Sequence, residues 1–163
     1  MVLRPEEVSD PVHARFMAEA LALAAEAASL GEVPVGAVVV QADRIIARGH
    51  NRRELDQDPT AHAELLAMRA ASKELGSWRL DDCTVYVTLE PCAMCAGAMV
   101  LARIPRCVYG AADPKGGFLG TLADLSAHPS LNHRFAVVPG VGAESAASLL
   151  RDFFRALRSK RSS

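Results

Sequence analysis

The segment that constrains the fold most runs from residue 83 to residue 112, where two apolar strands flank a short helix. Residues 83–90 (CTVYVTLE) and residues 106–112 (RCVYGAA) are rich in β-branched and apolar side chains. Pro91 suits the first turn of a helix, which we expect to continue to about Arg103. A strand, a helix and a second strand with so short a crossover favour parallel pairing of the strands. The chain is therefore expected to be an α/β protein with helices packed on a sheet.

The rest of the chain supplies three more strands and three more helices. Residues 36–41 (GAVVVQ) and 44–50 (RIIARGH) predict an antiparallel hairpin joined at Ala42 and Asp43, and residues 134–141 (RFAVVPGV) predict a fifth strand. Helices are expected from Asp10-Pro11 to Gly31, from near Thr60 to Gly76, and from Glu144 to about Arg158. The apolar stripes expected on the first two of these helices are Phe16, Ala20, Leu23, Ala27 and Leu30, and Ala61, Leu65, Met68, Ser72 and Leu75. Together these elements predict one domain, residues 1–163, with helices covering a mixed five-stranded sheet.

Composition narrows the class of protein. A chain of 163 residues, 50% hydrophobic, with four cysteines, can bury a core without a disulfide framework, which suits a reducing cytosol. The alanine-rich first 30 residues are interrupted by charges throughout, so we expect neither a signal peptide nor a membrane span. Residues 151–163 carry five basic groups and one acidic group within a chain of net charge −1. The basic side chains of this segment could bind phosphate groups. Equally, they could complement the helix dipole at a solvated helix C-terminus.

A second feature, Cys92-x-x-Cys95 together with His62-x-Glu64, predicts a reaction centre. Both cysteines lie at the start of a helix on one side, where the helix N-terminus favours the thiolate that binds metal. His62 and Glu64 are about 200° apart around a helix, but at its first turn both can approach a point beyond its end. His62, Cys92 and Cys95 would give Zn²⁺ three protein ligands and leave a fourth position for water. Glu64 would then be the acid that moves a proton.

Three alternatives remain open for these residues. Cys92 and Cys95 are also compatible with a thioredoxin-like redox pair, although that leaves His62 and Glu64 without a role. Glu64 in a first helical turn also stabilises the helix dipole. A closed structural zinc site needs a fourth ligand, for which the chain offers Cys83, Cys107, His50, His128 or His133.

The H-x-E and P-C-x-x-C pair resembles the signature of zinc-dependent nucleobase deaminases. Within them, the chain is similar to the family of bacterial tRNA-specific adenosine deaminases. The superfamily segments are DPTAHAE (58–64) and EPCAMC (90–95), and EVPVGAV (32–38) and GHN (49–51) also match. Three segments favour the tRNA-specific family over other members of the superfamily: the D-x-K-x-G loop (113–117), NHR (132–134) and DFFR (152–155). One departure is Gly117-Phe118-Leu119-Gly120-Thr121, where the family more often has small residues.

The resemblance implies a three-layer α/β/α fold of the cytidine deaminase type, with one zinc ion per subunit. It implies that a zinc-bound hydroxide attacks carbon 6 of the wobble adenosine in a tRNA anticodon loop, with Glu64 as proton shuttle. The substrate is expected to be a tRNA for arginine. The protein is expected to be a cytoplasmic homodimer, and no binding to DNA is expected. The residues assigned to the substrate by resemblance are Asn51, Ala63, Asp113, Pro34 and Val35. From the residues alone, Asn51 is a strand-end turn residue and Asp113 starts a turn.

The closing helix adds two more predicted contacts with RNA. Phe154 can stack on a flanking base while Arg155 meets a phosphate. The alternative is that Phe153 and Phe154 only dock the helix on the sheet. Two rival functions remain: deamination of a free base such as guanine or cytosine, and a noncatalytic zinc-stabilised RNA-binding module. The first would act on free bases, and the second would bind zinc and RNA without releasing ammonia.

Overall fold

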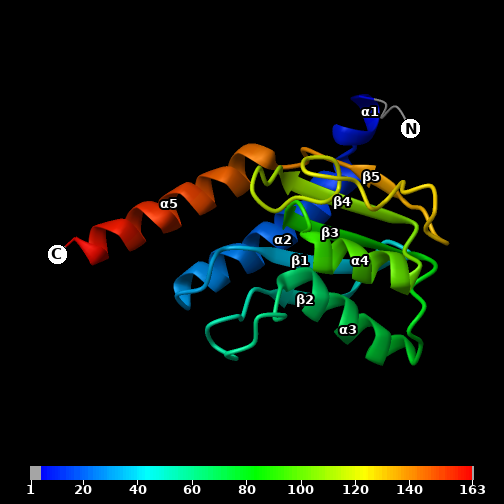
Figure 1. Ribbon diagram of the computed structural model, residues 1–163, viewed down its shortest axis with the longest axis horizontal. Helices are drawn as coiled ribbons and strands as arrows, with labels where there is room; N and C mark the ends of the chain where they lie inside the picture. The colour runs from blue at the N-terminus through cyan, green and yellow to red at the C-terminus, as the bar shows by residue number, and fades with distance from the viewer. Residues whose placement is uncertain (1–4, 163) are drawn as a thin grey trace.

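Five strands form one mixed sheet in the computed structural model, which describes residues 5–162 (Figure 1). In spatial order the strands are β2 (Arg44–His50), β1 (Gly36–Gln41), β3 (Cys83–Leu89), β4 (Arg106–Ala111) and β5 (Ala136–Val138). β1 runs antiparallel to both neighbours, whereas β3, β4 and β5 run parallel to one another. The predicted hairpin, parallel pairing and mixed sheet are confirmed. The ends of the predicted domain, residues 1–4 and 163, lie outside the described residues.

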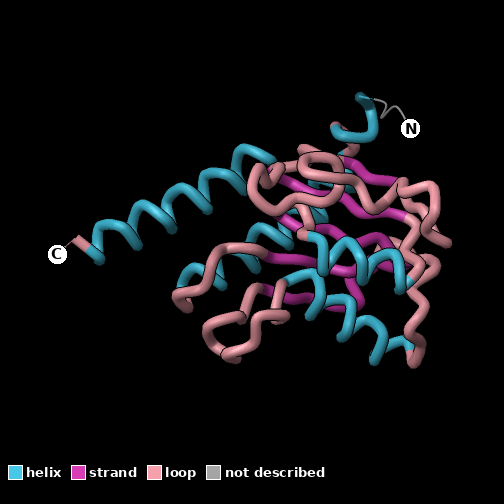
Figure 2. The backbone as a smooth tube through the Cα atoms, in the orientation of Figure 1, coloured by secondary structure: helices cyan, strands magenta, loops and turns pink. Residues whose placement is uncertain are grey.

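Helices cover both faces of this sheet (Figure 2). After the short α1 (Pro5–Val8), α2 (Pro11–Ser29) packs on one face, where Phe16 and Met17 share a buried cluster with Tyr86. α5 (Ala143–Arg161) begins on the same face. α3 (Ala63–Leu75) and α4 (Ala93–Ala102) cover the other face over a second cluster. The three-layer α/β/α architecture is thus confirmed. Across residues 5–162, no helix has the length and apolar character of a membrane span.

Local chemistry explains where several elements start and stop. Ala42 and Asp43 have φ values of 49° and 60°, the left-handed pair that a tight two-residue hairpin turn requires. The side chain of Asp10 accepts a hydrogen bond from the N–H of Val12 at 2.9 Å and caps α2. Gly76, at φ 63°, ends α3 as predicted.

The second predicted helix was placed wrongly at its start and on its buried face. α3 begins at Ala63 rather than near Thr60, because Asp58 accepts hydrogen bonds from both the N–H and the hydroxyl of Thr60. These local bonds hold a turn that competes with the helix. Its buried residues are Ala63, Glu64, Ala67, Met68 and Ala71, whereas the predicted Leu65, Ser72 and Leu75 are only partly buried.

The first and last predicted helices also needed correction. Leu30 of the first apolar stripe is 47% exposed just beyond α2, and Met17 and Ala24 are buried instead. The last helix continues to Arg161, past the predicted Arg158, and its second half extends away from the sheet (Figure 1). A helix that projects in this way presents its side chains to solvent or to a partner.

Strand register determines where functional side chains gather. Gly36 of β1 pairs with His50 of β2, and Ala37 pairs with Val87 of β3. The segment before β1 and the segments after β2 and β3 therefore meet at one end of the sheet. The end of β4 lies there as well, because Leu89 pairs with Ala111.

Candidate active site

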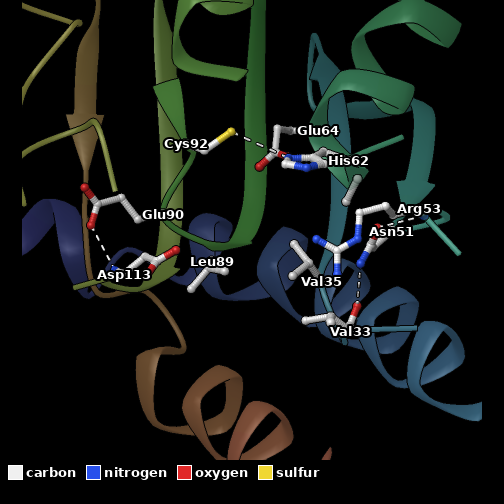
Figure 3. A pocket seen from close by; sticks show the side chains of 11 residues that line it. Val33, Val35, Asn51, Arg53, His62, Glu64, Leu89, Glu90, Cys92 and Asp113 are labelled. Carbon is white, nitrogen blue, oxygen red and sulfur yellow. Dashed lines mark hydrogen bonds between the residues drawn. The ribbon is translucent and has the colours of Figure 1, made fainter. Parts of the chain in front are cut away.

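His62 and Cys92 each precede a helix, and their side chains approach one another at this end of the sheet (Figure 3). Neither side chain makes a capping hydrogen bond to its own helix. Nδ1 of His62 lies 3.6 Å from Sγ of Cys92 and 3.6 Å from Sγ of Cys95. The three ligand atoms all lie within 4.8 Å of one another. The structure thus brings together the three residues predicted to bind metal.

A tetrahedral zinc ion fits these separations. Bonds of about 2.0–2.1 Å to nitrogen and about 2.3 Å to sulfur place tetrahedral nitrogen and sulfur ligands about 3.6 Å apart. Both nitrogen–sulfur distances in the site have this value. Zn²⁺ also prefers this mixture of imidazole and thiolate ligands. The donor set is therefore suited to zinc in both chemistry and spacing.

The two thiols of the site differ in acidity. A hydrogen bond from the Cys95 thiol, together with His62 beside it, lowers the pKa of Cys92 to about 3. The same hydrogen bond and burial raise the pKa of Cys95, while the hydrogen bond with Cys92 raises the pKa of His62. The lowered pKa of Cys92 favours its thiolate form at neutral pH. That is the form of cysteine that binds metal.

The described residues provide no fourth histidine, cysteine or acid in this group. Residues 5–162 contain one cluster of three or more such side chains that could hold a metal, and it has only these three members. The residues considered as a fourth ligand bond elsewhere or lie in the core: His50 to Asn51, His133 to Ile104, His128 to Ser130, Cys83 to Asp82, and Cys107 in the apolar cluster. The arrangement matches catalytic zinc sites, which use three protein ligands, better than closed structural ones.

Glu64 lies beside the three ligand residues. It is 4% exposed, and its Oε1 lies 3.1 Å from Sγ of Cys95, within hydrogen-bonding distance. Burial raises the pKa of Glu64 because the charged form loses its hydration. A carboxyl group that served only the helix dipole would not need to be buried. The geometry therefore suits a group that handles protons beside the candidate metal site.

A cavity of about 160 Å³ opens beside these groups (Figure 3). This volume is below the roughly 300–1,000 Å³ of pockets for drug-sized ligands, so it suits a single small ring system. The lining residues are Val33, Val35, Asn51, Arg53, His62, Ala63, Glu64, Leu89, Glu90, Cys92 and Asp113.

The lining includes most of the residues predicted to contact substrate. Val35, Asn51, Ala63 and Asp113 line the cavity, whereas Pro34 is buried and is not among the lining residues. The prediction missed Val33, Arg53, Leu89 and Glu90. A signal for the last two was present, since Leu89 ends β3 and Glu90 follows it, so both lie at the edge of the sheet that Cys92 also occupies.

Asn51 and Asp113 each accept local hydrogen bonds expected of turn residues, and Asn51 also donates a longer-range one. The side chain of Asn51 donates to the carbonyl of Val33 at 3.3 Å and accepts from the N–H of Arg53 at 3.1 Å. Oδ1 of Asp113 accepts from the N–H groups of Lys115 and Gly116. Both residues thus shape the backbone at the rim of the cavity, and both also line it.

Phe154 and Arg155 lie at a different place from the cavity. They line an open groove with Lys115, Leu150, Arg151 and Arg158. Phe154 is 40% exposed and meets Phe153 edge-on at 5.3 Å. Lys115 is two residues from Asp113, so a single loop reaches both the groove and the cavity.

Comparison with known proteins defines the class that this fold and site belong to. Residues 12–158 match the family described as MafB19-like deaminase, and the chain belongs to that deaminase family. Among the deaminases it resembles tRNA-specific adenosine deaminases. The one from Bacillus subtilis (strain 168) is 52% identical over 146 residues, covering 90% of this chain and 91% of that protein.

Two further relatives add to this comparison. A solved structure from a study of A-to-I editing by tRNA:A34 deaminases at the wobble position of transfer RNA has a TM-score of 0.81 and 44% identity. The match covers 83% of this chain and 99% of that one. The tRNA(Ile)-lysidine synthase of Deinococcus deserti (strain DSM 17065 / CIP 109153 / LMG 22923 / VCD115) is 54% identical over 147 residues. That match covers 89% of this chain and 27% of the relative, so the chain spans about a quarter of its length.

Proposed function

We propose that the chain hydrolyses adenosine to inosine at the wobble position of a tRNA anticodon loop, in a tRNA for arginine. The observation that carries the proposal is the group of His62, Cys92 and Cys95 with the buried carboxyl group of Glu64 beside it. Similarity to tRNA-specific adenosine deaminases supports the choice of substrate.

In this proposal His62, Cys92 and Cys95 hold one Zn²⁺ per chain. When bound, the ion supplies a nucleophile at neutral pH, because it lowers the pKa of water to about 7. The two helix N-termini place the imidazole and thiol groups, and the lowered pKa of Cys92 keeps its sulfur ready to bind.

Glu64 moves the protons of the reaction. Its carboxyl group accepts a proton from the attacking water and delivers it to ring nitrogen 1 of adenine, then assists departure of the amino group as ammonia. Its raised pKa suits a group that alternates between accepting and donating a proton. The backbone around Ala63 and the amide of Asn51 are proposed to hold the purine edge and its ribose.

The cavity walls favour an unstacked nucleobase. Val33, Val35 and Leu89 give the cavity an apolar side that excludes water, and an enzyme cannot reach carbon 6 of adenine inside a duplex. An unpaired loop nucleotide meets this requirement. Arg53 at the rim is then available to a neighbouring phosphate.

The groove on α5 is proposed to bind the RNA backbone, with Phe154 stacking on a flanking base and Arg155 meeting a phosphate. Each phosphate contact with single-stranded RNA contributes about 0.7 to the slope of log affinity against log salt. Reversing the charge of Arg155 and Arg158 should reduce the magnitude of the slope by about 1.4 or more. Arg44→Glu, in the hairpin at the other end of the sheet, is the control. An unchanged slope in the double variant removes these arginines from the RNA footprint.

A substrate panel separates the proposal from its rivals. Zinc-loaded protein is incubated with unmodified tRNA, with the anticodon stem-loop, and with free adenine, guanine and cytosine, and released ammonia is measured. The proposal predicts ammonia from the two RNA substrates alone. Ammonia from guanine or cytosine would identify a free-base deaminase, and tight RNA binding with no ammonia would identify a noncatalytic module.

The remaining expectations belong to the same proposal. The chain is proposed to act as one deaminase domain, residues 1–163, that pairs as a homodimer in the cytoplasm. Sedimentation of the zinc-loaded protein at micromolar concentration tests the pairing. A single species with the 17.3 kDa mass of one chain would contradict it.

A further inference from the structure

A buried carboxylate that neither binds the predicted metal nor faces the ligand group organises one wall of the cavity. Glu90 follows the last residue of β3 and is 2% exposed. Its Oε1 accepts hydrogen bonds from the N–H of Asp113 at 3.1 Å and from the hydroxyl of Thr121. Its Oε2 accepts from the N–H of Leu119 at 3.0 Å and from the N–H of Thr121 at 3.2 Å. All four donors belong to the loop that follows β4.

The loop is packed directly against this carboxylate. A Cβ atom added at Gly117 would lie 2.2 Å from Cδ of Glu90 and 2.4 Å from each of its oxygens. Beside it, the N–H of Phe118 donates to the carbonyl of Pro91 at 2.9 Å. The backbone therefore closes over Glu90 with no space for a side chain at position 117. Phe118 is partly buried and packs against the apolar cluster under α4.

This loop carries residues that face both candidate substrate surfaces. Asp113, at its start, lines the cavity, and Lys115 lines the basic groove. Glu90 holds the loop at its start, through Asp113, and at its end, through Thr121. If the acceptor is removed, three backbone N–H groups lose their partner, and the loop between them loses its fixed position.

We infer that Glu90 is a positioning residue that fixes the loop 113–121 at the mouth of the cavity and so sets the affinity for the RNA flanking the target base. The inference rests on the proposed RNA substrate. Proton transfer stays with Glu64, so loss of Glu90 should weaken substrate binding far more than it slows the chemical step.

The test compares wild type with Glu90→Gln, which keeps the size of the side chain but presents an amide N–H₂ to N–H donors. We expect KM for the anticodon stem-loop to rise about tenfold or more, with kcat within about twofold of wild type and zinc content unchanged. Amide hydrogen exchange should accelerate at Leu119 and Thr121. Glu74→Gln, the same change on the exposed side of α3, should alter none of these quantities.

A double-variant cycle distinguishes positioning from a general structural role. If Glu90 acts through Asp113, then Glu90→Gln combined with Asp113→Ala should raise KM no more than the stronger single change. The inference would be overturned if the two substitutions raised KM additively. It would also be overturned if amide hydrogen exchange at Leu119 and Thr121 were unchanged in Glu90→Gln. If Glu90→Gln fails to fold, Thr121→Val removes one donor and should raise KM severalfold, while Thr121→Ser retains it and restores the wild-type value.

Failure of the proposed function would be visible separately. Wild-type protein that makes no inosine would reject the deaminase proposal, whereas the exchange data do not depend on activity. In that case, RNA affinity replaces KM as the second readout. Equal affinity of wild type and Glu90→Gln, with a loosened loop, would then overturn the assigned role in binding.

Discussion

Gly49 is a position where one added methyl group should displace two residues of the candidate site, His62 and Glu64. Gly49 lies on β2 beneath α3, and a Cβ there would lie 2.5 Å from the carbonyl oxygen of Ala63 and 3.0 Å from the nitrogen of Ala67. Ordinary van der Waals contact begins at 3.4 Å, so Gly49→Ala should push the start of α3 away by about 1 Å. Ala63 sits between His62 and Glu64, and both would move with it.

The expected cost follows from this displacement. A misplacement of about 1 Å lowers catalysis by about 100-fold, so kcat/KM for inosine formation on an anticodon stem-loop should fall by about that factor. Overpacking should also lower the free energy of unfolding by about 1–3 kcal/mol. Initial rates, zinc content per chain and denaturant unfolding measure the three quantities on one preparation.

Gly97→Ala is the matched control, because it makes the same change two residues after Cys95 on α4. A Cβ at Gly97 meets nothing within 4 Å. This variant should keep wild-type kcat/KM and gain about 0.5–1 kcal/mol from the better helix former. Wild-type kcat/KM in Gly49→Ala, or equal losses in the two variants, would refute the claim that strand-to-helix packing positions the site.

Three further predictions concern the proton shuttle, the metal ligands and acid stability. Glu64→Gln should lower kcat by about 10²–10⁴ with zinc retained, and Glu74→Gln on the same helix should not; a normal rate with intact metal would reject the role of Glu64. Cys92→Ala should lower zinc content and the unfolding temperature together, and full zinc occupancy in this variant would contradict its assignment as a ligand. Burial lowers the pKa of His13, whose Nδ1 lies 2.8 Å from the hydroxyl of Tyr86. Below about pH 6.5 the unfolded chain therefore binds more protons at His13 than the folded protein does. The free energy of unfolding of wild type should decrease as the pH falls through this range. The His13→Gln variant should lose less free energy of unfolding than wild type between about pH 7 and about pH 5, as measured by denaturant unfolding at each pH. Parallel curves of unfolding free energy against pH for the two proteins would show that His13 makes no such contribution.

Strong local patterns explain which parts of the fold could be predicted. The turn at Ala42 and Asp43, the cap at Asp10 and the short crossover after β3 each depend on a few neighbouring residues. The ligand group was predictable for the same reason, since residue type and spacing identify His62 and the Cys92–Cys95 pair. Their convergence to 3.6 Å is a property of the assembled sheet.

The errors arise where local bonds compete with helix formation or where contacts are distant in sequence. Asp58 holds Thr60 in a turn, so α3 starts later and turns a different face to the core. Pro34 and Val33 are neighbours, and only the final path of the backbone decides which one lines the cavity. The contacts of Glu90 with Leu119 and Thr121 span about thirty residues, and no pattern in the strand itself reveals them.

The most direct test of the account is position-resolved sequencing for inosine after zinc-loaded protein is incubated with an unmodified tRNA for arginine. The account predicts inosine at the wobble position and at no other adenosine, in proportion to zinc occupancy. Full zinc occupancy with no inosine in the tRNA, or inosine formed equally by metal-free protein, would contradict it.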